Sequence, residues 1–282
     1  MKTMLNKGYL GSKFNLDKPE IVSVIDEVPL WSAPFGLKLL EIIMLKKKMN
    51  VLDIGFGLGF PMIEIAMRLG ASSKVYGIDP WEAAIERAKF KIKICNVRNV
   101  EITKGVAEEL PYEDNFFDLI VSNNGINNVE DMNKTFVECF RVTKKDSQFV
   151  FTMNLDSTML EFYNVYEEVL RNLAMFEEIE KMKQQVYDKR KPLQEVEAMV
   201  NKSGFKINQI VHDNFYLRYA NGTAMLNHFL IKMGFLEGWI KILPEDKLEI
   251  VFDQIETRLN EIAEKYGEIK MSVPFVTIDC KK

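Results

Sequence analysis

The chain has little of the side-chain chemistry that metal centres and disulfide frameworks need. It contains only 2 histidines among 282 residues, so a histidine-rich metal site is not expected and no metal is predicted. Its 3 cysteines, Cys95, Cys139 and Cys280, are odd in number and widely spaced. This spacing favours free thiols in the cytoplasm over a set of disulfides.

The chain also lacks an excess of charge of one sign and any long apolar run. Its 37 basic and 41 acidic residues give a net charge of −4. Proteins that bind nucleic acid or an anionic membrane carry an excess of basic residues, so neither partner is expected. No run approaches the roughly 20 apolar residues of a membrane helix, and the first residues lack the apolar core of a signal peptide. With 47% hydrophobic residues, we expect a cytoplasmic globular protein.

Strand-like and helix-like segments alternate along the middle of the chain. Short apolar segments predict strands at 49–54, 74–79, 100–103, 116–121 and 147–153. Amphipathic segments predict helices between them at 58–70, 80–94 and 131–142. This alternation indicates βαβ crossovers and a parallel, doubly wound α/β sheet with helices on both faces.

The flanking regions predict helices around this core. Residues 1–48 form an N-terminal helical cap, residues 49–155 the core, and residues 156–282 complete the sheet with helical insertions in the same overall domain. Further helices are expected at 33–45, 159–176, 192–205, 221–243 and 245–267, and further strands at 206–217 and 269–278. The apolar stripes of 159–176 and 245–267 serve either packing within the chain or a homodimer interface.

The segment VLDIGFGLG places three glycines, Gly55, Gly57 and Gly59, in a turn between a strand and a helix. Glycine permits a positive φ there and lets a ligand approach the backbone. Asp79 ends the next strand, where a carboxylate can accept both hydroxyls of a ribose. Together these residues predict an adenosine-containing cofactor.

The residues beside these glycines favour an amino-acid tail over a pyrophosphate. Phe60 stands where the dinucleotide fingerprint has its third glycine, and Asp53 lies two residues before Gly55. A carboxylate at that position repels phosphate and attracts an ammonium group. An NAD-dependent oxidoreductase and a non-catalytic nucleoside-binding protein remain as alternatives.

Four motifs in order, VLDIGFGLG, YGIDP, KGVAEELPYEDNFFDLIVSNNGINNV and ECFRVTKKDSQFVFT, resemble those of class I S-adenosylmethionine-dependent methyltransferases. The chain is most similar to the group that includes ubiquinone- and menaquinone-biosynthesis enzymes, over about residues 35 to 155. The resemblance implies a Rossmann-like seven-stranded sheet of order 3-2-1-4-5-7-6 with strand 7 antiparallel. It also implies S-adenosyl-L-methionine as cofactor, S-adenosyl-L-homocysteine as product and a small-molecule acceptor.

The same resemblance assigns cofactor-binding roles by position. The glycine turn would cradle methionine and ribose, Asp53 would face the amino group, and Asp79 would hold the ribose hydroxyls. The remaining positions implied near the adenine or the methionine end are Pro80, Trp81, Ala107, Glu108 and Asn123. Related enzymes commonly have an aspartate where this chain has Val106, which puts the role of Glu108 in doubt. The alternatives are that Asp53 braces the turn, that Asp79 caps a helix, that Trp81 only packs, and that Glu108 is a solvated charge.

The acceptor side is less specific in sequence. Methyl transfer from a sulfonium needs positioning more than a strong base, so no catalytic residue is assigned. The long segment 220–267 between the last two strands is predicted to form a lid or a dimerisation element. Tyr219 and His228 could reach the acceptor from it, or His228 is an ordinary helix residue. The acceptor-site candidates are Trp31, Phe35, Asn127, Asn128, Asn154 and His228.

Overall fold

The structure is a computed structural model that describes residues 7–28 and 30–282. Within these residues the chain forms two compact units. The sheet unit comprises Asn15–Leu155, Lys191–Asp213 and Phe275–Lys282, and the helical unit comprises 7–14, Asp156–Arg190 and Asn214–Pro274.

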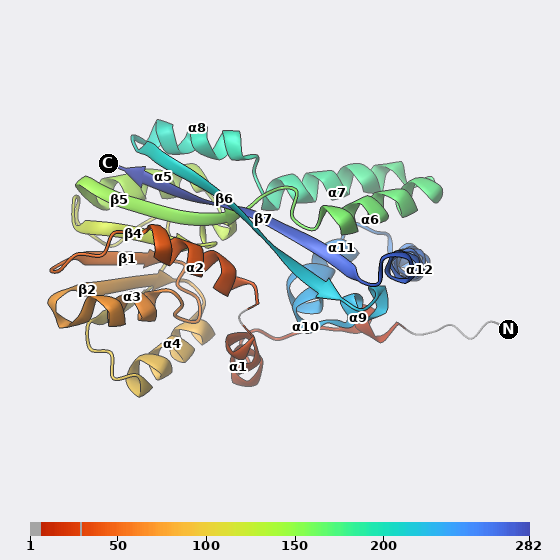
Figure 1. The fold of residues 1–282 in the computed structure, drawn as a ribbon, viewed down its shortest axis with the longest axis horizontal. Helices are drawn as coiled ribbons and strands as arrows, with labels where there is room; N and C mark the ends of the chain where they lie inside the picture. Colours follow the sequence, from red (N-terminus) through yellow and green to blue (C-terminus); the bar gives the residue numbers. More distant parts are fainter. Residues whose placement is uncertain (1–6, 29) are drawn as a thin grey trace. The chain divides into compact units, whose positions relative to one another are not determined.

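The sheet has seven strands in the order β3-β2-β1-β4-β5-β7-β6, which confirms the predicted fold class (Figure 1). β5 pairs with β7 in antiparallel fashion, whereas β1 with β2, β1 with β4, β2 with β3 and β4 with β5 pair in parallel. β6 and β7 contribute residues to both units. The strands are β1 Asn50–Ile54, β2 Lys74–Asp79, β3 Val100–Lys104, β4 Phe117–Asn123, β5 Thr143–Asn154, β6 Lys206–Tyr219 and β7 Ile269–Lys281.

Helices cover both faces of this sheet, because its strands present apolar side chains on both sides. Phe136, from α5, and Val196, from α8, belong to the buried cluster on one face. Leu39, Met62 and Ile85 bring α2, α3 and α4 into the cluster on the other face. The helices of the sheet unit are α1 Pro19–Glu27, α2 Ser32–Ile42, α3 Met62–Leu69, α4 Glu82–Ile94, α5 Met132–Val142 and α8 Leu193–Ser203, with the 3-10 turns η2 Gly70–Ser72 and η3 Ile126–Asn128.

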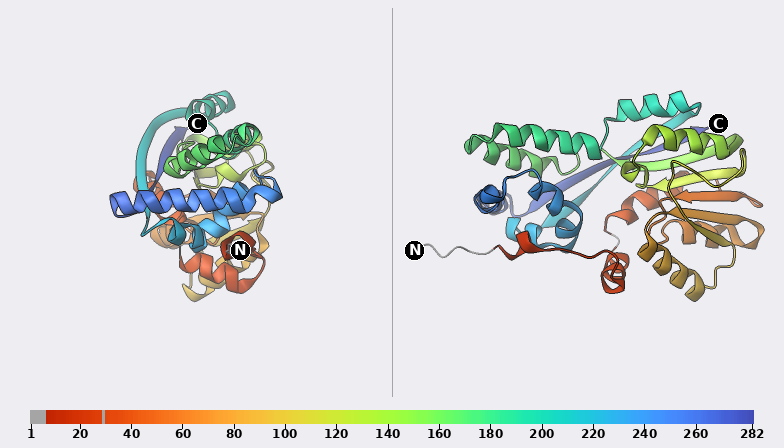
Figure 2. Two further views of the ribbon diagram at one scale, coloured as in Figure 1. Left: turned by 90° about the vertical axis from the view of Figure 1, so that its right-hand side faces the viewer. Right: turned by 180° about the vertical axis from the view of Figure 1, so that it is seen from behind.

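The helical unit is built mainly from the segments after β5 and after β6, as the predicted insertions require. α6 and α7 lie side by side in it (Figure 2). Its elements are η1 Gly8–Gly11, α6 Leu160–Asn172, α7 Phe176–Lys189, α9 Gly222–Asn227, α10 Phe229–Ile231, the π-helical η4 Lys232–Leu236, α11 Glu237–Ile240, η5 Glu245–Lys247 and α12 Leu248–Tyr266. None of the helices in the described part of the chain combines the length and the apolar character needed to cross a membrane.

Two helix predictions in this unit are wrong in detail. The helix expected over 159–176 ends at Asn172, because Ala174 adopts a φ of +54° that no α-helix tolerates, and α7 begins afterwards at Phe176. The helix expected over 221–243 is divided into the short elements from α9 to α11. Periodicity alone located the apolar faces but not these breaks.

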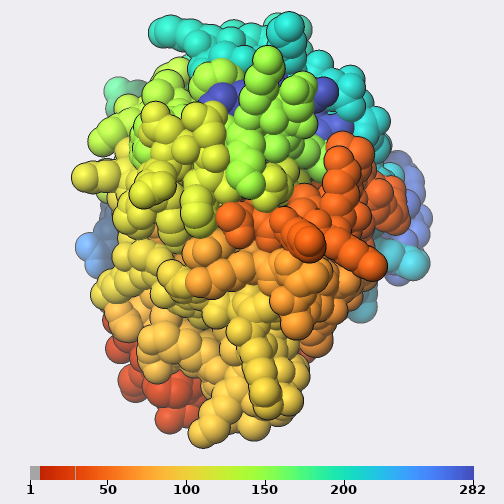
Figure 3. Space-filling view, turned by 90° about the vertical axis from the view of Figure 1, so that its left-hand side faces the viewer, coloured from red at the N-terminus to blue at the C-terminus, as the bar shows by residue number. Residues whose placement is uncertain are grey.

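The parallel strands all begin at one edge of the sheet, and this edge faces the viewer in Figure 3. The surface there is formed by segments coloured orange, yellow and yellow-green. The carboxyl ends of β1, β2, β4 and β5 lie at the opposite edge, which is the edge where ligands bind in open α/β sheets.

Candidate functional site

The glycine turn after β1 has the backbone conformation that the sequence predicts. Gly55, Gly57 and Gly59 have φ values of +70°, +50° and +101°, in the region that favours glycine. A methyl group at Gly57 would meet no atom within 4 Å, so this glycine is required by conformation and one side of the turn is open. A methyl group at Gly59 would lie 2.7 Å from Ile63, so this glycine also permits close packing.

Asp79, at the end of β2, ties the glycine turn to the start of the next segment. Its Oδ2 accepts a hydrogen bond from the N–H of Gly57 at 2.8 Å, and its Oδ1 accepts one from the N–H of Trp81 at 2.8 Å. Burial raises the pKa of Asp79, and the two N–H groups partly oppose that rise. Each oxygen keeps a second lone pair for a further donor such as a hydroxyl.

Asp53 is a buried carboxylate that the protein itself does not neutralise. It is fully buried, and neither oxygen has a hydrogen-bond partner of normal geometry among the described residues. Burial, and then the charge of Asp79, raise the pKa of Asp53 well above its usual range, while the Met62 N–H opposes this in part. An unpaired buried carboxylate is costly, and a ligand ammonium would compensate it. The site therefore fits a cofactor with an amino-acid tail.

The residues expected around the adenine lie at the same corner of the sheet unit. Pro80 is exposed and Trp81 is partly buried, with its Nε1–H donating to the carbonyl of Leu16 at 3.3 Å. A pocket of about 590 Å³ adjoins this corner, between α1 and the start of α4. Its lining residues are Asp17, Pro19, Val22, Glu82, Ala83, Glu86 and Arg87. The segment before α1 was not predicted to reach Trp81.

The loop that contains Ala107 and Glu108 is held by backbone contacts. Ala107 is buried, whereas Val106 is exposed where related enzymes commonly carry aspartate. Oε1 of Glu108 accepts hydrogen bonds from the N–H groups of Glu130 at 2.7 Å and Asp131 at 3.1 Å. Glu108 thus braces the start of α5, and its predicted adenine role stays a prediction.

Neutral polar side chains gather at the ends of β4 and β5. We call Asn123, Asn124, Asn127, Thr152 and Asn154 the amide cluster. Asn127 Nδ2 donates to Oδ1 of Asn154 at 2.6 Å and to Oδ1 of Asn124 at 3.2 Å. Thr152 Oγ1 accepts from the Asn124 N–H at 2.9 Å and donates to Asn123 Oδ1 at 3.2 Å. Residues 27 to 29 positions apart in the chain are thus joined in one network.

One acceptor atom of the amide cluster receives no hydrogen bond from the described residues. Because Nδ2 of Asn127 faces two acceptor oxygens, its amide orientation is fixed by the network. Its Oδ1 is buried and has no hydrogen-bond partner among the described residues. This oxygen is suited to accept a hydrogen bond from an N–H or O–H group of a ligand.

The Asn124-Gly125 turn gives the amide cluster its geometry. Asn124 has a φ of +58°, which asparagine tolerates better than most residues. A methyl group at Gly125 would lie 2.8 Å from the carbonyl oxygen of Ile54 and 3.4 Å from Cα of Gly55. Only glycine therefore lets the loop after β4 pack against the glycine turn after β1.

The structure brings only some acceptor-site candidates together. Asn127 and Asn154 belong to the amide cluster, while Asn128 is exposed and donates to the Asn124 carbonyl at 3.3 Å. Phe35 is fully buried, with ring centroids 5.4 Å from Trp31 and 4.8 Å from Phe275.

His228 belongs to the helical unit rather than the sheet unit. Its ring lies 5.2 Å from that of Tyr219, its Nδ1 is buried without a hydrogen-bond partner among the described residues, and burial lowers its pKa. Its acceptor-site role stays a prediction.

Sequence reasoning missed three residues that shape the sheet-unit site. Asn123 Nδ2 donates to the carbonyl of Ser32 at 3.0 Å, and a methyl group at Gly36 would lie 2.1 Å from the Phe60 ring. No local pattern marks Ser32 or Gly36, because their partners are distant in sequence. Thr152 was detectable, since it lies two residues before Asn154 and therefore on the same face of β5.

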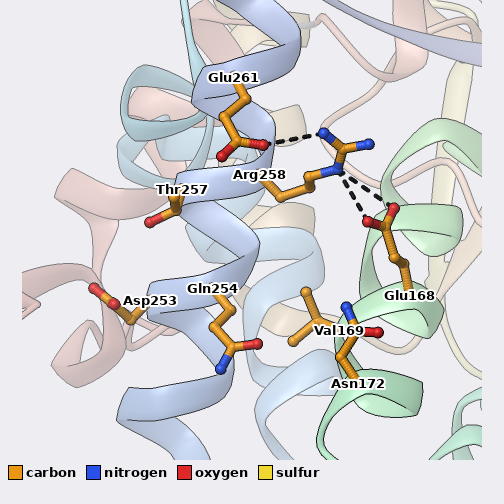
Figure 4. Close-up of a pocket in the computed structure, with 8 residues that line it drawn as sticks. All are labelled: Glu168, Val169, Asn172, Asp253, Gln254, Thr257, Arg258 and Glu261. Carbon is orange, nitrogen blue, oxygen red and sulfur yellow. Dashed lines mark hydrogen bonds and ion pairs between the residues drawn. The ribbon is translucent and has the colours of Figure 1, made fainter.

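A separate pocket of about 320 Å³ lies between α6 and α12 of the helical unit (Figure 4). Arg258 pairs there with Glu168 at 3.1 Å and with Glu261 at 3.0 Å, which leaves its charge compensated. None of the site residues predicted from sequence lines this pocket. We therefore place the candidate site at the sheet edge.

Comparisons with known proteins show the family of the chain. A family model described as "Methyltransferase domain" matches residues 45–225. The demethylmenaquinone methyltransferase of Bacillus mycoides is 32% identical over 127 residues, which cover 45% of this chain and 54% of the relative. The corresponding enzyme of Lactococcus lactis is 30% identical over 128 residues, covering 45% and 51%. The chain thus spans about half the length of the curated relatives it matches.

A solved structure shows the same fold. A putative methyltransferase from Bacillus halodurans has a TM-score of 0.57 at 19% identity, covering 88% of this chain and 98% of that one. The family match spans more than half of the chain and agrees with the strand order of the sheet. The chain belongs to the methyltransferase-domain family, and its assignment from sequence to the class I S-adenosylmethionine-dependent methyltransferases is confirmed.

Proposed function

We propose that this protein transfers a methyl group from S-adenosyl-L-methionine to a small-molecule acceptor. The observation that carries the proposal is the fully buried, uncompensated carboxylate of Asp53 beside the glycine turn. A cofactor that ends in an α-ammonium group would compensate this charge, whereas a pyrophosphate would be repelled by it. The family match supports the same cofactor. Nothing on the structure favours the oxidoreductase alternative.

The cofactor would be held by residues at or after four strand ends of the sheet unit. Asp53 would bind the ammonium group, the turn from Gly55 to Gly59 would leave room for the methionine and ribose, and Asp79 would accept the ribose hydroxyls. Pro80, Trp81 and Ala107 would contact the adenine. Asn123 would lie near the methionine end, because it stands at the end of β4 beside β1.

The amide cluster would orient the acceptor. The bound cofactor supplies a methyl group that is already activated on sulfur, so the protein has mainly to hold a lone pair in line with it. Oδ1 of Asn127 is free to accept a hydrogen bond from the acceptor and thereby to fix its lone pair. The amides at this position carry no charge and take no proton, which suits an acceptor that needs no strong base.

Demethylmenaquinone is the first acceptor to test, because it stands in the names of the relatives that match this chain. The experiment has two stages. Calorimetric titration with S-adenosylhomocysteine and with NADH separates the two cofactor classes, and tight binding of NADH alone would overturn the proposal. Labelled S-adenosylmethionine, with demethylmenaquinone and with a metabolite extract, then tests transfer. Cofactor binding without any labelled product would favour a non-catalytic binding protein.

A further inference from the structure

The helical unit contains four arginines, and one of them differs from the other three. Arg171 pairs with Glu167, Arg218 with Glu268 at 2.7 Å, and Arg258 with Glu168 and Glu261. These three side chains are 55%, 66% and 43% exposed, so water already solvates them. Arg190 is only 7% exposed, yet no described acidic side chain lies within ion-pair distance of its guanidinium.

The surroundings of Arg190 do not compensate its charge. Nη1 is buried and has no hydrogen-bond partner among residues 7–28 and 30–282. Glu178, the buried acid of α7, pairs with Lys181 at 3.2 Å instead. The guanidinium carbon lies 5.8 Å from the ring centroid of Tyr163, a cation–π contact worth about 0.5 to 2 kcal/mol. An unpaired buried charge costs more than such a contact returns.

The aromatic group beside Arg190 is fixed in place. The hydroxyl of Tyr163 accepts a hydrogen bond from Nε1 of Trp239 at 3.2 Å, and Trp239 stacks on Phe162 with ring centroids 3.8 Å apart. Arg190 itself follows α7 directly, with its backbone N–H donating to the carbonyl of Val186 at 2.9 Å. The guanidinium and the ring are thus both carried by ordered elements, which keeps a binding geometry ready without a ligand.

We propose that Arg190, with the ring of Tyr163 beside it, is the binding site for a small oxyanion, namely a carboxylate or a phosphate group. The planar guanidinium donates paired N–H groups at the spacing of such oxygens, and a bound oxyanion would supply both the missing partner of Nη1 and the missing charge. This inference does not depend on methyl transfer.

The test measures the thermal unfolding midpoint of the full chain in sodium acetate and in sodium phosphate, each matched in ionic strength by sodium chloride. We expect at least one oxyanion to raise the midpoint above the chloride value. A larger effect of phosphate assigns a phosphate ligand, and a larger effect of acetate assigns a carboxylate ligand. The apparent dissociation constant, from the dependence of the midpoint on concentration, should rise about tenfold or more in Arg190→Gln, which corresponds to about 1.4 kcal/mol.

Two further variants serve as controls for this test. Arg190→Lys retains the charge but loses the planar fork, so we expect it to bind the oxyanion several-fold more weakly than the wild type while still folding. Arg258→Gln, which removes an exposed and paired arginine, should bind as the wild type does. The proposal is overturned if neither oxyanion acts beyond chloride, or if Arg190→Gln and Arg258→Gln respond to the oxyanion equally.

Discussion

The carboxyl edge of the sheet has a charged half and a neutral half. β1 and β2 end in the buried carboxylates Asp53 and Asp79, whereas β4 and β5 end in the amides and hydroxyl of the amide cluster. The charged half fits a cofactor that brings a cation and hydroxyl groups. The neutral half fits an acceptor that is oriented without being deprotonated. Charged and neutral polar groups thus lie on different strands of one sheet, as the proposed division between cofactor binding and acceptor orientation requires.

The largest expected effect comes from removing Asp79. In Asp79→Ala the ribose loses its acceptor, and the Gly57 and Trp81 N–H groups lose their partner. Since a hydrogen bond to a charged group contributes about 1.5 to 3 kcal/mol, we expect the dissociation constant of S-adenosylhomocysteine to rise at least tenfold. Calorimetry measures this, with Glu101→Ala, an exposed acid near the start of β3, as control. Unchanged affinity would reduce Asp79 to a residue that only caps the following segment.

Replacing Asp53 tests the charged half of the edge through the pH dependence of protein stability. The pKa of Asp53 is higher in the folded than in the unfolded protein. Below the unfolded-state pKa, Asp53 is protonated in both states and its contribution to the free energy of unfolding is fully present. As pH rises toward the folded-state pKa, Asp53 ionises more readily in the unfolded protein, and this contribution is lost. Without ligand, Asp53→Asn should therefore unfold at a higher temperature than the wild type, and the gap should widen from pH 5 to pH 7.5. A gap that narrows with pH would contradict the assigned direction.

The same variant should behave in the opposite way toward the cofactor product. The ligand ammonium holds Asp53 ionised, so wild-type affinity for S-adenosylhomocysteine should increase from pH 5 to pH 7.5. Asp53→Asn should bind about tenfold more weakly at pH 7.5 and lose much of this pH dependence. Calorimetry at both pH values checks the result, and equal affinity of the two proteins at pH 7.5 would leave Asp53 as a brace of the turn.

On the neutral half, Asn127→Ala should lower turnover and leave cofactor affinity nearly unchanged. Losing one neutral hydrogen bond costs about 0.5 to 1.5 kcal/mol, so kcat/KM for the acceptor should fall about three- to tenfold. The rate of label transfer and the calorimetric affinity are measured together, with the exposed Asn128→Ala as the matched control. If only cofactor affinity changed, the division of the edge into two halves would be wrong.

Only a small effect on cofactor binding is expected for Glu108→Gln. Glu108 accepts hydrogen bonds from two backbone N–H groups before α5, and glutamine keeps an acceptor oxygen there. We expect affinity for S-adenosylhomocysteine to change less than about twofold and the free energy of unfolding to fall by about 1 kcal/mol. Calorimetry and urea unfolding measure the two quantities. A tenfold loss of affinity would instead place Glu108 at the adenine.

Elements with a strong local signal were predictable. The strands β1, β2, β4 and β5 contain apolar runs, β3 alternates apolar and polar residues, and α5 and α12 have amphipathic stripes. Their positions therefore follow from periodicity. The break between α6 and α7 was not predictable, because it depends on the left-handed conformation of Ala174, a residue with no preference for it. The same limit applies to the short helices from α9 to α11, whose divisions depend on packing.

The candidate site shows the same division between local and distant causes. The glycine turn and Asp79 lie within 25 residues of each other and follow the order of strand, turn and strand, so one reading of the chain finds them. The amide cluster joins residues from two separated strand ends, and nothing near Asn127 indicates that Asn154 is its partner. The contact of Asn123 with Ser32 spans 91 positions.

The sequence by itself determined the alternation of strands and helices, the glycine turn and the acidic residue after β2, because each depends on backbone preferences and neighbours close in the chain. Only the tertiary structure decided which polar groups end buried without a partner. Asp53, Oδ1 of Asn127 and Nη1 of Arg190 acquire that state from burial by distant segments. Burial removes water as a hydrogen-bond partner, and this turns ordinary polar residues into candidate binding groups.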